Sequence, residues 1–82
     1  SKKVTDTDLR KAKADYFFEV NKNILGLNDP GRELKESQQQ RDNLNFSHLE
    51  YTQEYEGVSV LGASVIAHFD DQNRLYAVNS SL

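Results

Sequence analysis

Apolar residues recur at helical spacing in the first third of the chain. At about 100° per residue, they gather in one arc of roughly 140°. The members of this arc are Leu9, Ala12, Tyr16, Phe17, Val20 and Ile24. Thr5 and Thr7 are both suitable N-caps, and Gly26 is a natural left-handed end. The pattern predicts a helix over residues 7–25 whose arc faces the core, with the stem of Lys13 lying on that core.

Phe18 points nearly opposite this arc. The strand region contains a second apolar residue without an obvious place, because Ile66 stands beside Val65 and the two face opposite sides. If such residues cluster on the surface, they mark an interface with another protein. Phe18 and Ile66 are therefore candidate interface residues, and the alternative is that each is an isolated exposed side chain.

Polar and apolar residues alternate along residues 48–55, which is typical of a β-strand with one wet face. The side predicted to face the core carries Leu49, Tyr51, Gln53 and Tyr55. Gly57 then permits a turn, and Gly62 suggests a bulge or bend in the next strand. The Asp-Asp-Gln-Asn sequence of residues 70–73 is typical of a hairpin turn.

Strands are accordingly predicted at about residues 33–39, 47–56, 58–70 and 74–80. The helical stripe and the inward side of the strands are each too apolar to remain in water, so they should cover one another. We predict an α+β fold in which one long N-terminal helix packs on one face of a three- to four-stranded antiparallel β-meander. Residues 1–82 are expected to form a single domain.

Composition narrows the possible functions. The chain has 10 Lys and Arg against 13 Asp and Glu, a net charge of −3, so sustained attraction to nucleic acid or to an anionic membrane is not expected. Cysteine is absent, which removes disulfides and thiolate metal ligands. No apolar run approaches the ~20 residues of a membrane span. Residues 1–4 lead directly into polar sequence without a signal peptide, which fits either a cytosolic protein or an excised piece of an exported one.

No set of residues has the spacing of a catalytic or cofactor site. His48 and His68 could share a sheet face and, with Glu50, bind a metal, but two histidines on a partly wet face are the preferred interpretation. The acidic residues of the 70–73 turn superficially resemble calcium ligands, although the glycine and distal glutamate of such a loop are missing. Glu54 and Glu56 are interpreted as surface charge. We predict a chain that is not an enzyme and needs no cofactor or metal.

A more specific signal lies in residues 48–63, which continue through an alternating strand that ends in His68-Phe69-Asp70. This sequence resembles the fungalysin/thermolysin propeptide (FTP) domain of secreted thermolysin-like zinc metalloprotease precursors. The family pattern reads roughly His, apolar, Arg, aromatic, then Gln, Tyr and Gly, then Val-Pro-Val-Phe-Gly, and later His-x-Asp. The matching positions here are His48, Gln53, Tyr55, Gly57, Val58, Val60, Gly62 and His68. Residues 16–27 resemble the first helix of the family, so the likeness covers nearly the whole chain.

Several positions depart from the family pattern. Glu50 stands where Arg is usual, Ser59 where Pro is usual and Leu61 where Phe is usual. Asn45 lies where a glycine is expected, and Ser80 replaces the closing glycine. These substitutions preserve the strand pattern. The fold implied by the resemblance is therefore retained.

The matched residues also have structural interpretations. Gly57 and Gly62 would permit the turn and the bulge, and Tyr55 and Val60 would fill the core. Gln53 would face inward and satisfy its amide there. We prefer this structural interpretation to direct contact with a partner.

The resemblance implies a function. In that family the domain begins a long propeptide, and a second propeptide domain of PepSY type and the zinc protease domain follow in the same precursor. The propeptide assists folding of the enzyme as an intramolecular chaperone and inhibits the zymogen until it is cleaved. By resemblance, this chain is a non-catalytic propeptide module of a secreted or cell-surface protein. The alternative is a stand-alone interaction or adhesive module of an exported protein without a protease.

Overall fold

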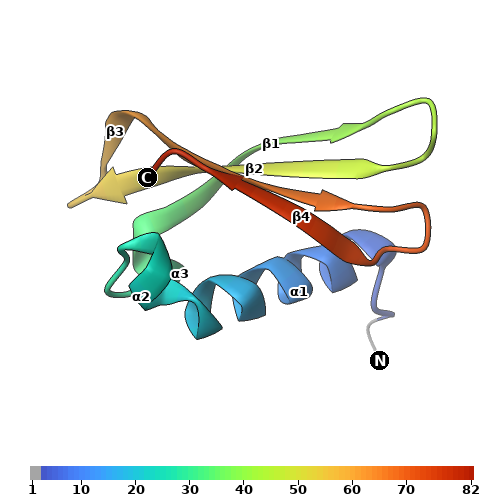
Figure 1. Ribbon diagram of the computed structural model, residues 1–82, viewed down its shortest axis with the longest axis horizontal. Helices are drawn as coiled ribbons and strands as arrows, with labels where there is room; N and C mark the ends of the chain where they lie inside the picture. The colour runs from blue at the N-terminus through green and yellow to red at the C-terminus, as the bar shows by residue number, and fades with distance from the viewer. Residues whose placement is uncertain (1–2) are drawn as a thin grey trace.

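The computed structural model describes residues 3–82, in which a four-stranded antiparallel sheet carries a helix on one face (Figure 1). The helices are α1 (Asp6–Val20), α2 (Lys22–Leu25) and α3 (Pro30–Glu33). The strands are β1 (Leu34–Arg41), β2 (Ser47–Tyr55), β3 (Val58–Phe69) and β4 (Leu75–Ser80), in the sheet order β1-β2-β3-β4. The predicted α+β class is confirmed, and each strand lies within two residues of its predicted bounds.

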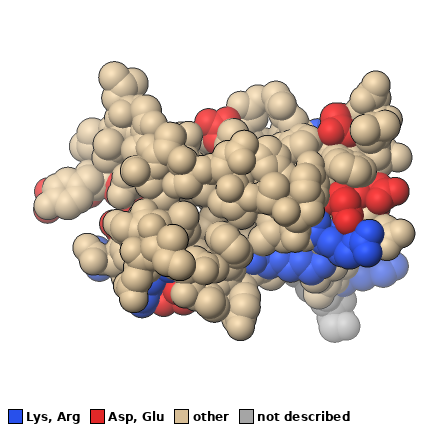
Figure 2. All heavy atoms as spheres, in the orientation of Figure 1, with Lys and Arg blue, Asp and Glu red and all other residues tan. Residues whose placement is uncertain are grey.

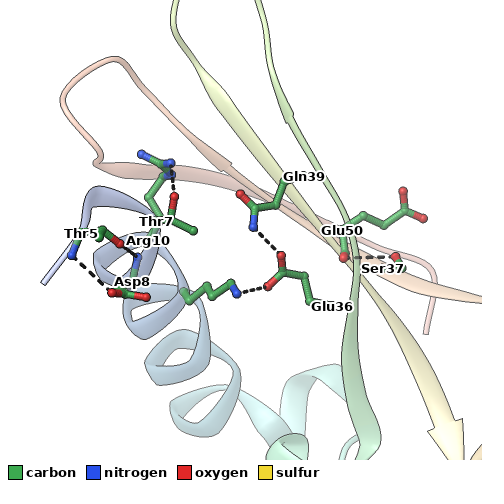
Figure 3. A network of polar contacts seen from close by, with 9 residues as sticks. Thr5, Thr7, Asp8, Arg10, Glu36, Ser37, Gln39 and Glu50 are labelled. Atoms are coloured by element: carbon green, nitrogen blue, oxygen red, sulfur yellow. Dashed lines mark hydrogen bonds and ion pairs between the residues drawn. The ribbon is translucent and has the colours of Figure 1, made fainter. Parts of the chain in front are cut away.

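Local sequence explains where α1 begins and where the helical segment ends. Thr5 is the N-cap, and its hydroxyl accepts a hydrogen bond from the Asp8 amide at 3.1 Å while the Asp8 carboxylate accepts one from the Thr5 amide at 3.3 Å. This capping box satisfies two amides that the first helical turn leaves free (Figure 3). The single helix predicted over residues 7–25 is divided at Asn21 into α1 and α2, and α2 ends at Gly26, whose φ of 76° is left-handed as predicted.

The prediction of which face of the helix is buried is wrong. Among the residues of the predicted stripe, Phe17 is half-buried, whereas Tyr16 and Ile24 are 73% and 87% exposed. The remaining exposed members are Leu9, Ala12 and Val20. The residues of α1 that are buried are Arg10, Ala14 and Phe18. They follow one another at intervals of four, so they form a single face that lies against the sheet.

Phe18 sets this orientation of the helix. Its side chain is 1% exposed, and its ring meets the ring of Tyr51 edge to face at a centroid distance of 5.0 Å. Phe17 packs against the same cluster at its margin. The cluster holds one large aromatic from α1 and alternate residues of the strands: Leu34, Leu49, Tyr51, Val65, Ala67 and Phe69. Tyr51 thus faces the core as predicted.

Polar contacts at the other end of the buried helix face tie α1 to the β3–β4 turn. Arg10 donates to Asn73 Oδ1 at 2.7 Å, and Lys13 donates to the Asn73 carbonyl oxygen at 2.6 Å. Asn73 has a φ of 61°, and the Asp70 carboxylate accepts hydrogen bonds from the amides of Gln72 and Arg74. The predicted hairpin turn at residues 70–73 is confirmed. The Lys13 ammonium is held by this turn.

Candidate functional site

The end of the β2–β3 hairpin, residues 55–61, is here called the hairpin tip. Glu56 and Gly57 both have positive φ, 50° and 81°, which is the backbone conformation of a two-residue turn that matches strand twist. Pairing between the strands is regular as far as Thr52 opposite Ser64. It shifts before Glu54, which lies opposite Ser59, so β3 bulges where Gly62 has a φ of 79°. The turn at Gly57 and the bulge at Gly62 were both predicted.

The apolar residues of the hairpin tip are on the surface. Tyr55 is 70% exposed, Val58 68%, Val60 40% and Leu61 fully exposed. The prediction that Tyr55 and Val60 fill the core is therefore wrong. In Figure 1 the tip projects beyond α2 and α3.

Acidic residues surround one side of the hairpin tip. A hollow of about 290 Å³ lies between the tip and the α3 region. Its charged lining residues are four acids, Asp29, Glu33, Glu54 and Glu56, and one base, Arg32. The Glu33 carboxylate accepts hydrogen bonds from the amides of Asn28 and Asp29, at 2.8 and 2.6 Å, which fixes the loop that borders the hollow. Figure 2 shows the projecting end as an arm of mostly uncharged atoms with acidic atoms beside it.

The last residues of the chain are held at the base of the hairpin tip. The Ser81 amide donates to the Ser64 carbonyl oxygen at 2.8 Å, and the Ser81 hydroxyl donates to the Gly62 carbonyl oxygen at 3.0 Å. Leu82 therefore lies at the same end of the sheet as the tip, as Figure 1 shows. The bulge, the tip and the end of the chain form one connected region.

The two histidines meet on the sheet face that α1 does not cover. His48 and His68 are directly paired across β2 and β3, and their Nδ1 atoms are 2.7 Å apart. His48 Nε2 lies 2.9 Å from the Asp42 carboxylate. With both rings neutral, His48 donates from Nε2 to Asp42, and His68 donates from Nδ1 to His48. Only one proton can lie between the two Nδ1 atoms, so the rings form a chain that resists double protonation.

The electrostatics of this chain follow from its geometry. Burial, and then the neighbouring His48, lowers the pKa of His68. The hydrogen bond from His48 is the main cause that lowers the pKa of Asp42, and amide donors at Phe46 and Leu44 add to it. Among residues 3–82, no group of three or more His, Cys, Asp or Glu is placed to hold a metal ion. The arrangement is a hydrogen-bonded histidine pair rather than the three-ligand site considered from the sequence.

Ile66 is half-buried on the same face. With the histidines it borders a shallow hollow of about 220 Å³ whose other walls are Gln38, Gln40 and Glu50. Tyr76 lies nearby, and its ring contacts those of Phe46 and His68. The surface around Ile66 is therefore mixed, and its role as an interface residue stays a prediction.

Phe18 is not available for an interface. The prediction placed it on the outer helix face, but it is the largest side chain of the core that α1 contributes. The two candidate residues consequently do not form one patch.

The exposure of Leu61 at the hairpin tip was not predicted from the sequence. This residue was treated only as a departure from the family pattern. Its signal was the run Val58, Val60 and Leu61 between two glycines, which puts apolar side chains on both faces of one short segment.

No helix in the part of the chain that the structure describes is long and apolar enough to cross a membrane.

Comparisons with known proteins agree with the resemblance seen in the sequence. A family model described as the Fungalysin/Thermolysin Propeptide Motif matches residues 32–82, which include the whole sheet and leave α1 outside the match. Bacillolysin of Bacillus subtilis (strain 168) is 35% identical over 66 residues, which are 80% of this chain and 12% of that protein. Bacillolysin of Bacillus amyloliquefaciens is 35% identical over 72 residues, 88% of this chain and 13% of that protein. No solved structure matches the chain significantly.

The chain belongs to the fungalysin/thermolysin propeptide motif family. It spans only 12% to 13% of the length of these curated relatives. Within the matched region, the positions singled out from the sequence separate into two groups. His48 and His68 form the pair on the open sheet face, and the hairpin holds Gln53, Tyr55, Gly57, Val58, Val60 and Gly62.

Proposed function

We propose that this chain is a non-catalytic propeptide module that assists the folding of a secreted zinc metalloprotease and inhibits it within one precursor. Residues 1–82 would form one FTP-like domain, and a PepSY-type domain and the protease domain would follow. Membership of the propeptide family and the similarity to bacillolysins support this proposal. A module of this kind needs no catalytic groups, because packing on a folding intermediate stabilises it by burying apolar surface.

The observation that carries the proposal is the exposure of the apolar hairpin tip. The core of this domain is small, and the side chains of Tyr55, Val58 and Leu61 are in water, so they do not stabilise the domain itself. Such a surface becomes favourable when another protein covers it. A binding role accounts for these side chains, whereas a purely structural role does not.

The proposal is tested in the full-length gene product. Its sequence should contain a His-Glu-x-x-His motif downstream of Leu82. Refolding of the denatured precursor should give active protease after cleavage, and removal of residues 1–82 should strongly reduce the yield. The uncleaved precursor should hydrolyse a protein substrate far more slowly than the processed enzyme. A gene that lacks a protease domain and carries repeated copies or cell-wall domains would instead support the stand-alone adhesive module.

A further inference from the structure

We propose that the hairpin tip, residues 55–61, is the contact surface through which this module binds the polypeptide that follows it in the precursor. The surface that receives it is an apolar pocket with a basic rim. The inference rests on the proposed function and specifies which part of the module makes the contact. Three features of the tip support it.

The first feature is an apolar projection with a defined backbone turn. Tyr55, Val58 and Leu61 are each at least two-thirds exposed, and no core residue lies among them. The turn at Glu56 and Gly57 and the bulge at Gly62 hold the segment in a defined shape. A preformed projection loses little conformational freedom on binding, so most of the apolar area that it buries contributes to affinity. The partner that fits such a shape is a concave apolar pocket.

The second feature is the charge around the projection. The hollow beside the tip is lined by four acidic residues and one basic residue, and Glu54 and Glu56 belong to the hairpin itself. Acidic groups at the margin of an apolar contact attract lysine and arginine on the facing surface and disfavour acidic surfaces. The complementary rim is therefore basic.

The third feature is the place where the chain ends. Ser81 is bonded to Gly62 and Ser64, so Leu82 leaves the sheet at the base of the tip. A polypeptide that continues from Leu82 begins beside this surface. Its first folded part is held close to the tip at high effective concentration, and a modest contact area is then sufficient for stable docking.

Hydrogen exchange tests the contact directly. Exchange of the amides of residues 55–62 is measured by mass spectrometry in the full-length precursor and in the isolated 82-residue chain. We expect these amides to exchange at least about tenfold more slowly in the precursor, because docking covers them. Equal exchange rates in the two proteins would overturn the inference.

Substitutions in the full-length precursor test whether the tip matters for folding. Leu61→Ser removes a fully exposed apolar side chain of the tip, and Ile24→Ser removes one that is 87% exposed on α2. We expect Leu61→Ser to lower the refolding yield of active protease about tenfold, the size of effect typical of a central contact residue, and Ile24→Ser to leave it unchanged. Thermal unfolding of the two isolated variants should match that of the unsubstituted chain, since neither side chain is in the core. Equal losses for both variants would overturn the tip as the specific surface.

A charge variant tests the basic rim. Glu54→Gln combined with Glu56→Gln should lower the refolding yield by a smaller factor, and high salt should reduce the difference from the unsubstituted precursor. An unchanged yield at low salt would overturn the basic rim.

Deletion of residues 1–82 separates the proposed function from the proposed docking surface. If the deletion lowers the yield and Leu61→Ser does not, the docking surface is wrong and the propeptide function stands, whereas an unaffected deletion variant contradicts both.

Discussion

The same two strands, β2 and β3, behave differently at their two ends. At one end, Leu49 pairs with Ala67 and Tyr51 with Val65, and all four side chains are buried. At the other end, beyond the bulge, the alternation of apolar residues continues but its members are in water. The difference is the helical layer, because α1 covers the first end and stops short of the second (Figure 1).

Alternation of polar and apolar residues therefore identifies the two faces of a strand but not whether a face is covered. Burial requires a second element of sufficient length, and α1 with α3 supplies it only beneath the regular part of the sheet. The apolar side chains past that limit contribute little to the stability of this domain. They remain available to a partner.

The largest expected effect is at the covered end. Phe18→Ala should lower the free energy of unfolding by about 3–5 kcal/mol, because it removes the ring that packs on Tyr51 and leaves a cavity between α1 and the sheet. Chemical denaturation followed by circular dichroism measures the loss. If the variant does not fold, Phe18→Leu should fold and show a smaller loss. Tyr55→Ala is the matched control from the hairpin tip, and similar losses for Phe18→Ala and Tyr55→Ala would contradict the contrast between the two ends.

The same substitution, leucine to alanine, can be made at both ends of the β2–β3 pair to compare the loss of stability. Leu49 is 1% exposed in β2 and Leu61 is fully exposed in β3. Leu49→Ala should cost about 2–5 kcal/mol, whereas Leu61→Ala should stay within about 0.5 kcal/mol of the unsubstituted chain. Urea denaturation of both variants checks this. A loss above about 1 kcal/mol for Leu61→Ala would mean that the tip packs on the domain.

The boundary between the ends depends on Gly62. Gly62→Ala should cost about 1 kcal/mol, because alanine is strained at a φ of 79° even though its Cβ meets no atom within 4 Å. Gly31→Ala is the control, since the φ of Gly31 is not positive and the added Cβ makes only an ordinary contact at 3.8 Å with Asp29. Thermal unfolding should separate the two variants. Equal losses would show that backbone conformation at the bulge is not what matters.

The smallest effect concerns pH and the open sheet face. The pKa of His68 is lower in the folded chain than its ordinary value of 6.5, so the unfolded chain binds the proton more readily. The stabilising contribution is therefore complete above about pH 6.5 and is lost as pH falls through the lower folded pKa. Unfolding curves between pH 7.5 and about pH 5 should show a modest loss of stability. His68→Asn should flatten this dependence, and an unchanged slope would contradict the role of the histidine pair.

Much of the fold was predictable from the sequence, and the reasons are local. Glycines and the Asp-Asp-Gln-Asn turn act through their own backbone preferences, so the turn at Gly57, the turn at residues 70–73 and the end of the helical segment at Gly26 were predicted. Asn45 replaces an expected glycine and has a φ of 64°, a conformation that asparagine tolerates better than most residues. The pairing of His48 with His68 was anticipated only as a shared face. Strand register brings their Nδ1 atoms into contact. Turn residues alone do not determine which residues of two strands lie directly opposite each other.

By itself, the sequence determined the order of the helix and strands, the turns between them and the family to which the chain belongs, because these depend on local preferences and on a linear pattern. Tertiary structure decided which face of α1 is buried and which apolar strand residues remain in water. The face with Arg10, Ala14 and Phe18 was chosen because Phe18 fits against Tyr51 and Arg10 reaches the turn at Asn73. Burial results from contact between elements, so the distribution of apolar residues along one helix does not by itself predict which face is buried.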